Sequence, residues 1–102
     1  MPEAAAVGRP RVAVITGAAR GIGAAIADRL AQAEHHVAVV DIDGDAADET
    51  ARSIQDRHRV AAIGIGADVA DSDCVRRAFD QLRAELGPVS VLVNNAGVIS
   101  AA

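Results

Sequence analysis

Short apolar runs alternate along the chain with longer stretches in which apolar residues recur every three or four positions. The runs are rich in β-branched residues and too short for helices, which is typical of buried strands. They predict strands at residues 11–15, 37–40, 60–65 and 89–93. The stretches between them have the spacing of amphipathic helices, so the pattern predicts strands and helices in strict alternation.

Each of the intervening stretches carries an apolar stripe that predicts the buried face of a helix. The stripes are Ile22, Ile26 and Leu30 with Ala25 and Ala33 beside them; Ala47, Ala51, Ile54 and His58; and Val75, Ala78, Phe79, Leu82 and Leu86. Asp43-Gly44-Asp45 and Asp71-Ser72-Asp73 offer capping oxygens before the second and third helices, and Gly87-Pro88 ends the third. The first helix ends without a glycine, at Glu34-His35-His36. We expect a histidine to adopt positive φ there, with no chemical role.

Strands that alternate with helices require parallel pairing, and their crossovers are right-handed. The expected sheet has four strands in the order 3-2-1-4, with helices on both faces. The sequence therefore predicts an α/β protein, with a Rossmann-type three-layer α/β/α domain over residues 11–102 that is truncated before the later strands. Residues 1–10 predict a disordered tail. A ligand crevice is expected between the first and fourth strands, where the strand order reverses.

Gly17, Gly21 and Gly23 lie between the first strand and the first helix, the context that a dinucleotide-binding loop requires. Gly17 permits the tight turn off the strand, Gly21 lets backbone approach a pyrophosphate, and Gly23 lets the helix pack against the sheet. The first helical turn then presents unpaired N–H groups and partial positive charge to the phosphates. The alternative is that these glycines only turn the chain.

Asp41 directly follows the second strand, eighteen residues after Gly23. An ionised carboxylate there accepts hydrogen bonds from the hydroxyls of an adenosine ribose. A 2′-phosphate in the same place would meet like charge, which costs about 4 kcal/mol per charge pair at 4 Å and an effective dielectric constant of 20. Arg20 acts in the opposite direction, because a guanidinium can pair with that phosphate. We judge the carboxylate decisive and expect NAD, with NADP disfavoured; the alternative for Asp41 is to cap the following turn.

Further motifs occur in a fixed order along the chain. T-G-A-A-R-G-I-G stands at residues 16–23, Asp68-Val69 follows the third strand, and N-N-A-G stands at residues 94–97. Together with the Gly-x-x-x-Gly-x-Gly spacing, they resemble the short-chain dehydrogenase/reductase family, in its NAD-preferring branch. The resemblance covers nearly the whole chain. It implies an NAD(H)-dependent oxidoreductase that moves hydride between nicotinamide and an alcohol or carbonyl carbon.

The resemblance implies a role in cofactor binding for each matching position. Gly17 through Gly23 would wrap the pyrophosphate, with Ile22 on the nicotinamide side. Asp41 would hold the adenosine ribose, and Ile42 and the Asp68-Val69 pair would bind the adenine. Asn95 and the two residues after it would run along the cofactor, while the asparagine before it braces the fourth strand. The expected cofactor-binding residues are Gly17, Ala19, Arg20, Gly21, Ile22, Gly23, Asp41, Ile42, Asp68, Val69, Asn95, Ala96 and Gly97.

The catalytic group of that family has no match in this sequence. The family uses a serine, a Tyr-x-x-x-Lys pair and a helix asparagine, in which the tyrosine transfers a proton and the lysine lowers its pKa. The chain has no Tyr, and all ten of its Lys and Arg positions are Arg. Ser100 lies too early to replace the family serine, and Cys74 forms no nucleophile–base set with the histidines. We expect no catalytic residue and no metal site, and a chain that on its own binds NAD at best.

Charge and apolar surface bear on the partners of the chain. A net charge of −4 and a pI near 5.2 disfavour a nucleic-acid or anionic-membrane surface. No apolar stretch approaches the roughly 20 residues of a membrane span, and the lone Cys74 cannot form an internal disulfide, so we expect a cytoplasmic protein.

The edge of the fourth strand, at Val91 and Val93, predicts self-association or a complementing chain. The alternatives are a stand-alone NAD-binding module, one half of a split enzyme, or a gene remnant that never folds.

Overall fold

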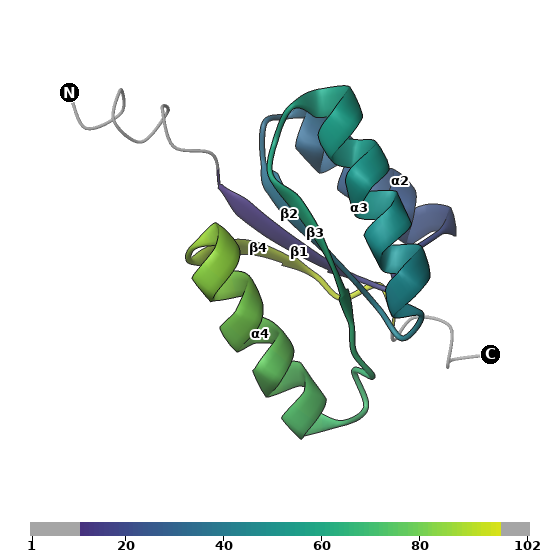
Figure 1. Ribbon diagram of the computed structural model, residues 1–102, viewed down its shortest axis with the longest axis vertical. Coiled ribbons are helices and arrows are strands. Elements are labelled where there is room, and N and C mark those ends of the chain that lie inside the picture. The colour runs from purple at the N-terminus through teal and green to yellow at the C-terminus, as the bar shows by residue number, and fades with distance from the viewer. Residues whose placement is uncertain (1–10, 97–102) are drawn as a thin grey trace.

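The computed structural model describes residues 11–96, which form a parallel sheet flanked by helices (Figure 1). The elements are β1 (Val12–Thr16), α2 (Gly21–Gln32), β2 (His36–Asp41), α3 (Gly44–His58), β3 (Ala62–Gly66), α4 (Ser72–Leu86) and β4 (Val89–Val93). The predicted alternation of strands and helices is confirmed. The expected tail at residues 1–10, the site residue Gly97 and Ser100 lie outside the described residues.

The strands form one parallel sheet in the order β3-β2-β1-β4, as predicted. β1 lies between β2 and β4, so that Val14 pairs with both Ala38 and Leu92. Helices α2 and α3 cover one face of the sheet, and α4 covers the other (Figure 1). The fold is therefore the predicted Rossmann-type three-layer arrangement, and the carboxyl ends of β1 and β4 meet where the strand order reverses.

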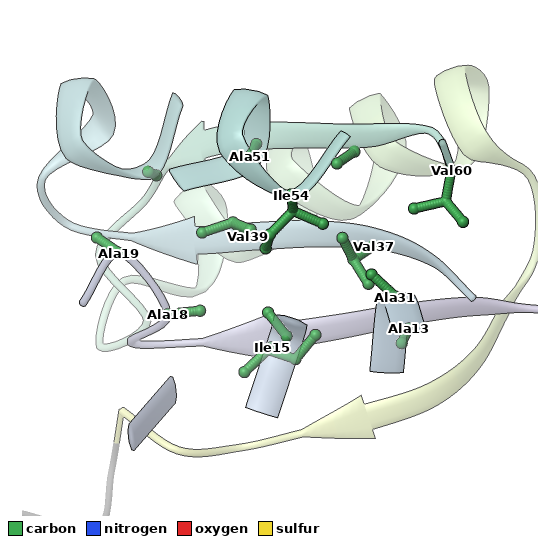
Figure 2. Packing of buried hydrophobic residues seen from close by; sticks show 13 residues of the cluster. Ala13, Ile15, Ala18, Ala19, Ala31, Val37, Val39, Ala51, Ile54 and Val60 are labelled. Atoms are coloured by element: carbon green, nitrogen blue, oxygen red, sulfur yellow. The ribbon is translucent and has the colours of Figure 1, made fainter. Parts of the chain in front are cut away.

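The sheet divides the core into two apolar clusters, because successive strand residues point to opposite faces. The strand residues under α2 and α3 are Ala13, Ile15, Val37 and Val39 (Figure 2). The cluster under α4 contains Val14, Ala38, Val40 and Leu82. Since β1 and β2 are buried on both faces, their sequences are continuous apolar runs with no polar alternation.

Helix α2 buries a face of smaller residues than its apolar stripe predicts. Its buried residues are Gly23, Ala27 and Ala31. Ile26 and Leu30 are only partly buried beside them, Ile22 is 74% exposed, and Ala25 and Ala33 are exposed. The prediction that Ile22, Ala25 and Ala33 belong to the buried stripe is wrong, because the face that packs on the sheet is the one formed by the small residues, which let α2 approach closely.

The turn from α2 to β2 is made at Glu34, which has a φ of 68°. The expectation that a histidine takes positive φ here is therefore wrong. His35 places its Nδ1 atom 3.1 Å from the Leu30 carbonyl oxygen at the end of α2. His36 begins β2, and its Nδ1 accepts a hydrogen bond from the Ala61 N–H at 2.9 Å. Both rings are thus held by backbone groups, which fits a structural role.

Strand β3 begins at Ala62, two residues later than predicted. Arg59 at the end of α3 adopts the left-handed region, with a φ of 58°, so the chain turns there before it extends. Val60 is buried in the core without joining the sheet, and Gln55 Oε1 accepts from the Ala62 N–H at 3.1 Å. Helix α4, in contrast, ends as predicted at Gly87, which has a φ of 103°.

The predicted caps of α3 and α4 are confirmed. Asp43 Oδ1 accepts a hydrogen bond from the Ala46 N–H at 3.1 Å. Asp71 Oδ1 accepts from the N–H groups of Asp73 and Cys74, at 2.9 and 3.3 Å. Each carboxylate satisfies N–H groups that have no partner within the helix, which is why these helices begin where they do.

Candidate functional site

The loop between β1 and α2 turns at two glycines with positive φ. Gly17 has a φ of 63° and Gly21 a φ of 66°, a region that favours glycine. A Cβ atom at Gly23 would lie 2.3 Å from the Gly17 carbonyl oxygen, so α2 can begin this close to the loop only with glycine there. A Cβ atom at Gly21 would meet nothing within 4 Å. Gly21 therefore faces open space, whereas Gly23 faces the loop.

The N-terminus of α2 differs from those of the other helices in its capping. Within residues 11–96, no side chain caps its first turn, and that turn contains no acidic residue. Helices α3 and α4 each have an aspartate cap and a further aspartate in the first turn. At α2, the backbone N–H donors and the positive end of the helix dipole are therefore left for an anionic ligand.

Asp41 at the end of β2 is bound to backbone on two sides. Its Oδ2 accepts a hydrogen bond from the Ala19 N–H at 3.1 Å, and its Oδ1 accepts one from the Asp43 N–H at 3.0 Å. The second bond is the turn-capping role that the sequence left as an alternative. The first joins the carboxylate to the glycine loop. Each oxygen retains a second lone pair, which can accept from a ligand hydroxyl.

Two further contacts hold the glycine loop against α3. The Thr50 hydroxyl donates to the Ala19 carbonyl oxygen at 2.5 Å. Arg20 Nη2 donates to Asp43 Oδ2 at 2.9 Å in an exposed ion pair. This bond and the Asp43 charge raise the pKa of Arg20, while the Ala46 N–H and then Arg20 lower the pKa of Asp43. Sequence reasoning missed Thr50 and the pairing role of Asp43, because nothing in a local pattern pairs residues 23 or 31 positions apart.

The other side of the loop is fixed by the residues that follow β4. Thr16 Oγ1 accepts from the Ala96 N–H at 3.1 Å and lies 3.3 Å from Asn94 Oδ1. Asn95 Nδ2 donates to the Gly17 carbonyl oxygen at 3.1 Å. The two asparagines therefore join the end of β4 to the start of the glycine loop.

A cleft of about 560 Å³ lies at the carboxyl ends of the strands. Its lining residues are Gly17, Arg20, Gly21, Ile22, Asp41, Ile42, Ala67, Asp68, Val69, Asn95 and Ala96. Apart from Ala67, all were predicted from the sequence to bind the cofactor. The predicted residues Ala19 and Gly23 are buried and shape the loop behind the cleft. Ile42 and Val69, which are 75% and 40% exposed, give the cleft an apolar part that is open to a ligand.

Among the described residues, the lining of this cleft brings together neither a metal site nor a histidine, cysteine, serine or tyrosine. None of its lining residues is His, Cys, Ser or Tyr, and residues 11–96 bring no three His, Cys, Asp or Glu side chains together as a metal site. Cys74 lies half-buried on α4, and His58 Nε2 lies 2.9 Å from Asp28 Oδ1, joining α3 to α2. None of the helices in the described part is long and apolar enough to cross a membrane.

Comparison with known proteins decides the family. The sequence profile described as short chain dehydrogenase matches residues 11–102. The chain belongs to the short-chain dehydrogenase family. It is 46% identical over 88 residues to the cis-4-hydroxycyclohexanecarboxylate dehydrogenase of Sinomonas cyclohexanicum. It is 42% identical over 100 residues to the 3-oxoacyl-[acyl-carrier-protein] reductase MabA of Mycobacterium avium. These matches cover 86% and 94% of this chain and 34% of each relative.

A solved structure shows the same arrangement of strands and helices. The L-sorbose reductase of Gluconobacter frateurii, in complex with NADPH and L-sorbose, superposes with a TM-score of 0.82 at 37% identity. The match covers 88% of this chain and 34% of the reductase. The chain therefore spans about a third of the length of these relatives. The family and the Rossmann-type fold inferred from the sequence are confirmed.

Proposed function

We propose that this chain is the NAD(H)-binding part of a short-chain dehydrogenase, which moves hydride between nicotinamide and an alcohol or carbonyl substrate. The observation that carries the proposal is the uncapped N-terminus of α2, which opens on a cleft that Asp41 also lines. A helix end that binds anions and a carboxylate that binds hydroxyls, in one cleft, complement a dinucleotide better than a lone phosphate.

The cleft fits the phosphate and ribose groups of a dinucleotide. The N–H groups at the start of α2 would donate to the pyrophosphate, and Gly21 places no side chain in front of them. Asp41 would accept from the adenosine ribose hydroxyls with the lone pairs that its backbone contacts leave open. The folded chain already holds these N–H groups and the Asp41 carboxylate in place, so the protein needs little further ordering when the dinucleotide binds.

The adenine end of the cleft is apolar, with one acid. Ile42 and Val69 would cover the faces of the base, since both are exposed and line the cleft. Asp68 also lines the cleft, and its Oδ1 accepts from the Ala70 N–H at 2.9 Å. That bond orients the carboxylate, whose other oxygen would accept from the adenine amino group.

The remaining wall would position the nicotinamide. Bound NAD(H) supplies the hydride acceptor or donor, and the chain's residues orient it. Ile22 and Ala96 line the cleft and would lie along the nicotinamide, and Asn95 is fixed by its bond to the Gly17 carbonyl. Gly97, which the sequence also assigned to the cofactor site, lies outside the described residues. Because the sequence contains no Tyr and no Lys, we expect the chain alone to bind NAD without turnover.

The preference for NAD rests on charge at the ribose. A 2′-phosphate beside Asp41 would meet its negative charge in a partly buried position. The L-sorbose reductase complex holds NADPH on a similar fold, so the fold by itself does not exclude NADP. The acid at the end of β2 is therefore the residue that we propose selects NAD.

A second candidate is an NAD-binding module that works with another chain. Among the described strands, β4 pairs only with β1, and its Leu92 is 56% exposed. An edge strand with an exposed apolar side chain favours pairing with a further strand. Recovery of a protein that restores dehydrogenase activity to the purified chain would support this candidate, and turnover by the chain alone would contradict it.

Isothermal titration calorimetry with NAD and NADP tests the proposal. We expect NAD to bind the chain at least tenfold more tightly than NADP, about 1.4 kcal/mol. Asp41→Asn removes the charge and should reduce the ratio of the Kd for NADP to the Kd for NAD about tenfold. The control Asp80→Asn, on helix α4, should leave this ratio unchanged. If neither dinucleotide binds the wild-type chain, the proposed function is wrong.

A further inference from the structure

Arg20 lines the cleft, but its guanidinium pairs with Asp43, which is not among the lining residues. A guanidinium is well suited to pair with a phosphate on the ribose 2′ oxygen. We propose that Asp43 is a specificity-determining residue, because by holding Arg20 it withholds this guanidinium from a 2′-phosphate and so favours NAD over NADP. The inference rests on the proposed function and adds a second acid to the preference assigned to Asp41.

The carboxylate of Asp43 is fixed before it meets Arg20. Its Oδ1 accepts the capping bond from the Ala46 N–H at 3.1 Å, and its backbone N–H donates to Asp41 Oδ1 at 3.0 Å. Only Oδ2 faces Arg20, at 2.9 Å. Since the helix cap sets the orientation of the carboxylate, Asp43 cannot follow Arg20 toward a ligand. Arg20 must leave it to reach a 2′-phosphate.

The surroundings of Arg20 strengthen this competition. The Asp43 bond and charge contribute most to the raised pKa of Arg20, and Asp41 and Glu49 add to it at longer range. The ion pair is exposed, with 69% of the Arg20 side chain and 44% of the Asp43 side chain accessible. Exposed pairs are weak, so the expected contribution to NADP binding is about twofold to fivefold in Kd.

The capping and pairing roles of Asp43 can be separated, because they use different oxygens. Asn is as good an N-cap as Asp, so Asp43→Asn retains an oxygen for the Ala46 N–H while it removes the charge that holds Arg20. A purely structural role for Asp43 predicts no change in the NADP to NAD ratio. Asp43 thus acts as a positioning residue, through Arg20.

Calorimetric titration of a double-mutant cycle is the test. We expect D43N to raise the affinity for NADP relative to that for NAD about twofold to fivefold, because any change in the order of the loop affects both dinucleotides alike. In the R20Q chain, where no guanidinium is released, adding D43N should leave this relative affinity unchanged within about 1.5-fold. D80N removes a different arginine-paired aspartate and is the control for net charge.

The outcomes separate this inference from the proposed function. If NAD binds and D43N leaves the ratio of NADP to NAD affinity unchanged, Asp43 has no part in specificity and the inference is wrong. An equal gain in the Arg20 and R20Q chains would also overturn it, because Asp43 would then act on the phosphate without Arg20. Absence of NAD and NADP binding in the wild-type chain overturns the proposed function, and this inference with it.

Discussion

The Ala19-Arg20 segment is held on three sides by groups from other elements. Asp41 at the end of β2 accepts from the Ala19 N–H, Thr50 of α3 donates to the Ala19 carbonyl, and Asp43 pairs with Arg20. The loop that would wrap a pyrophosphate is thus fixed by the same region that would bind the ribose. Preorganisation of this kind lowers the entropy that binding must overcome.

A prediction at this scale concerns the hydroxyl of Thr50. Thr50→Val keeps the side-chain shape but leaves the Ala19 carbonyl without its 2.5 Å bond. We expect a loss of about 1 kcal/mol, seen as roughly fivefold weaker NAD binding in calorimetric titration, because the loop is less ordered. Thr50→Ser, which keeps the hydroxyl, should bind as the wild type does. Wild-type affinity in the valine variant would show that the bond does not prepare the loop.

Sequence reasoning identifies residues whose chemistry is local and misses those defined by long-range contact. The glycines of the loop and Asp41 were predicted because their type and spacing are set by backbone geometry at one turn and one strand end. Thr50 lies 31 residues from Ala19, and an isolated threonine in a helical stretch carries no pattern. Its role follows only once α3 is placed beside the loop.

At the scale of single elements, the aspartate caps give α4 a pH dependence. The N–H groups of Cys74 and Asp73 lower the pKa of Asp71 below its ordinary value of 3.8. A group with a lowered folded-state pKa stabilises the fold fully above its unfolded-state value, and this stabilisation is lost as the pH falls through the folded-state pKa. The cap therefore contributes at neutral pH and is lost in acid, below about pH 4.

Thermal unfolding temperatures at neutral and acid pH test the role of the Asp71 cap. Asp71→Asn retains a capping oxygen but cannot be protonated in this range, so its thermal unfolding temperature should fall less than that of the wild type between about pH 6 and about pH 3. Asp80→Asn removes a carboxylate that caps no helix start, so its unfolding temperature should fall as much as that of the wild type. If the unfolding temperatures of the Asp71→Asn variant and the wild type fall equally, the Asp71 cap does not cause the pH dependence.

A second element-scale prediction concerns the contact between α3 and β3. A Cβ atom at Gly64 would lie 2.4 Å from the Asp48 backbone N, so the strand passes the helix at a distance that only glycine allows. Gly64→Ala should cost about 1–3 kcal/mol in urea denaturation followed by circular dichroism. Gly66→Ala, whose Cβ would lie 3.1 Å from Gly44 Cα, should cost less. A larger loss of unfolding free energy in Gly66→Ala than in Gly64→Ala would contradict the close contact of α3 and β3 at Gly64.

Element types were predictable, but boundaries and faces less so. Apolar runs and caps located every strand and helix, because periodicity and capping oxygens act over a few residues. The start of β3 was placed early, since Val60 is apolar and buried yet lies in the turn after Arg59. The exposed Ile22 was assigned to the core because a helical stripe cannot distinguish a core residue from one that lines a cleft.

At the scale of the whole molecule, the residues that line the cleft gather at one end of the sheet. Four strand ends supply the cleft, and in the described residues the opposite ends of the strands contribute none of its lining. The topology explains this, because parallel strands present all their carboxyl ends together and the order reverses between β1 and β4. The strand order was predictable from the alternation of elements, and hence so was the position of the cleft.

Thermal unfolding followed by calorimetry tests most directly whether this chain binds NAD selectively, as we propose. A ligand that binds only the folded state stabilises it by about 2.7 kcal/mol at a hundredfold excess over Kd, which shifts the transition measurably. We expect one cooperative transition, whose midpoint temperature NAD raises and NADP at the same concentration raises less. A transition that neither dinucleotide moves, or that NADP raises as far as NAD does, would contradict it.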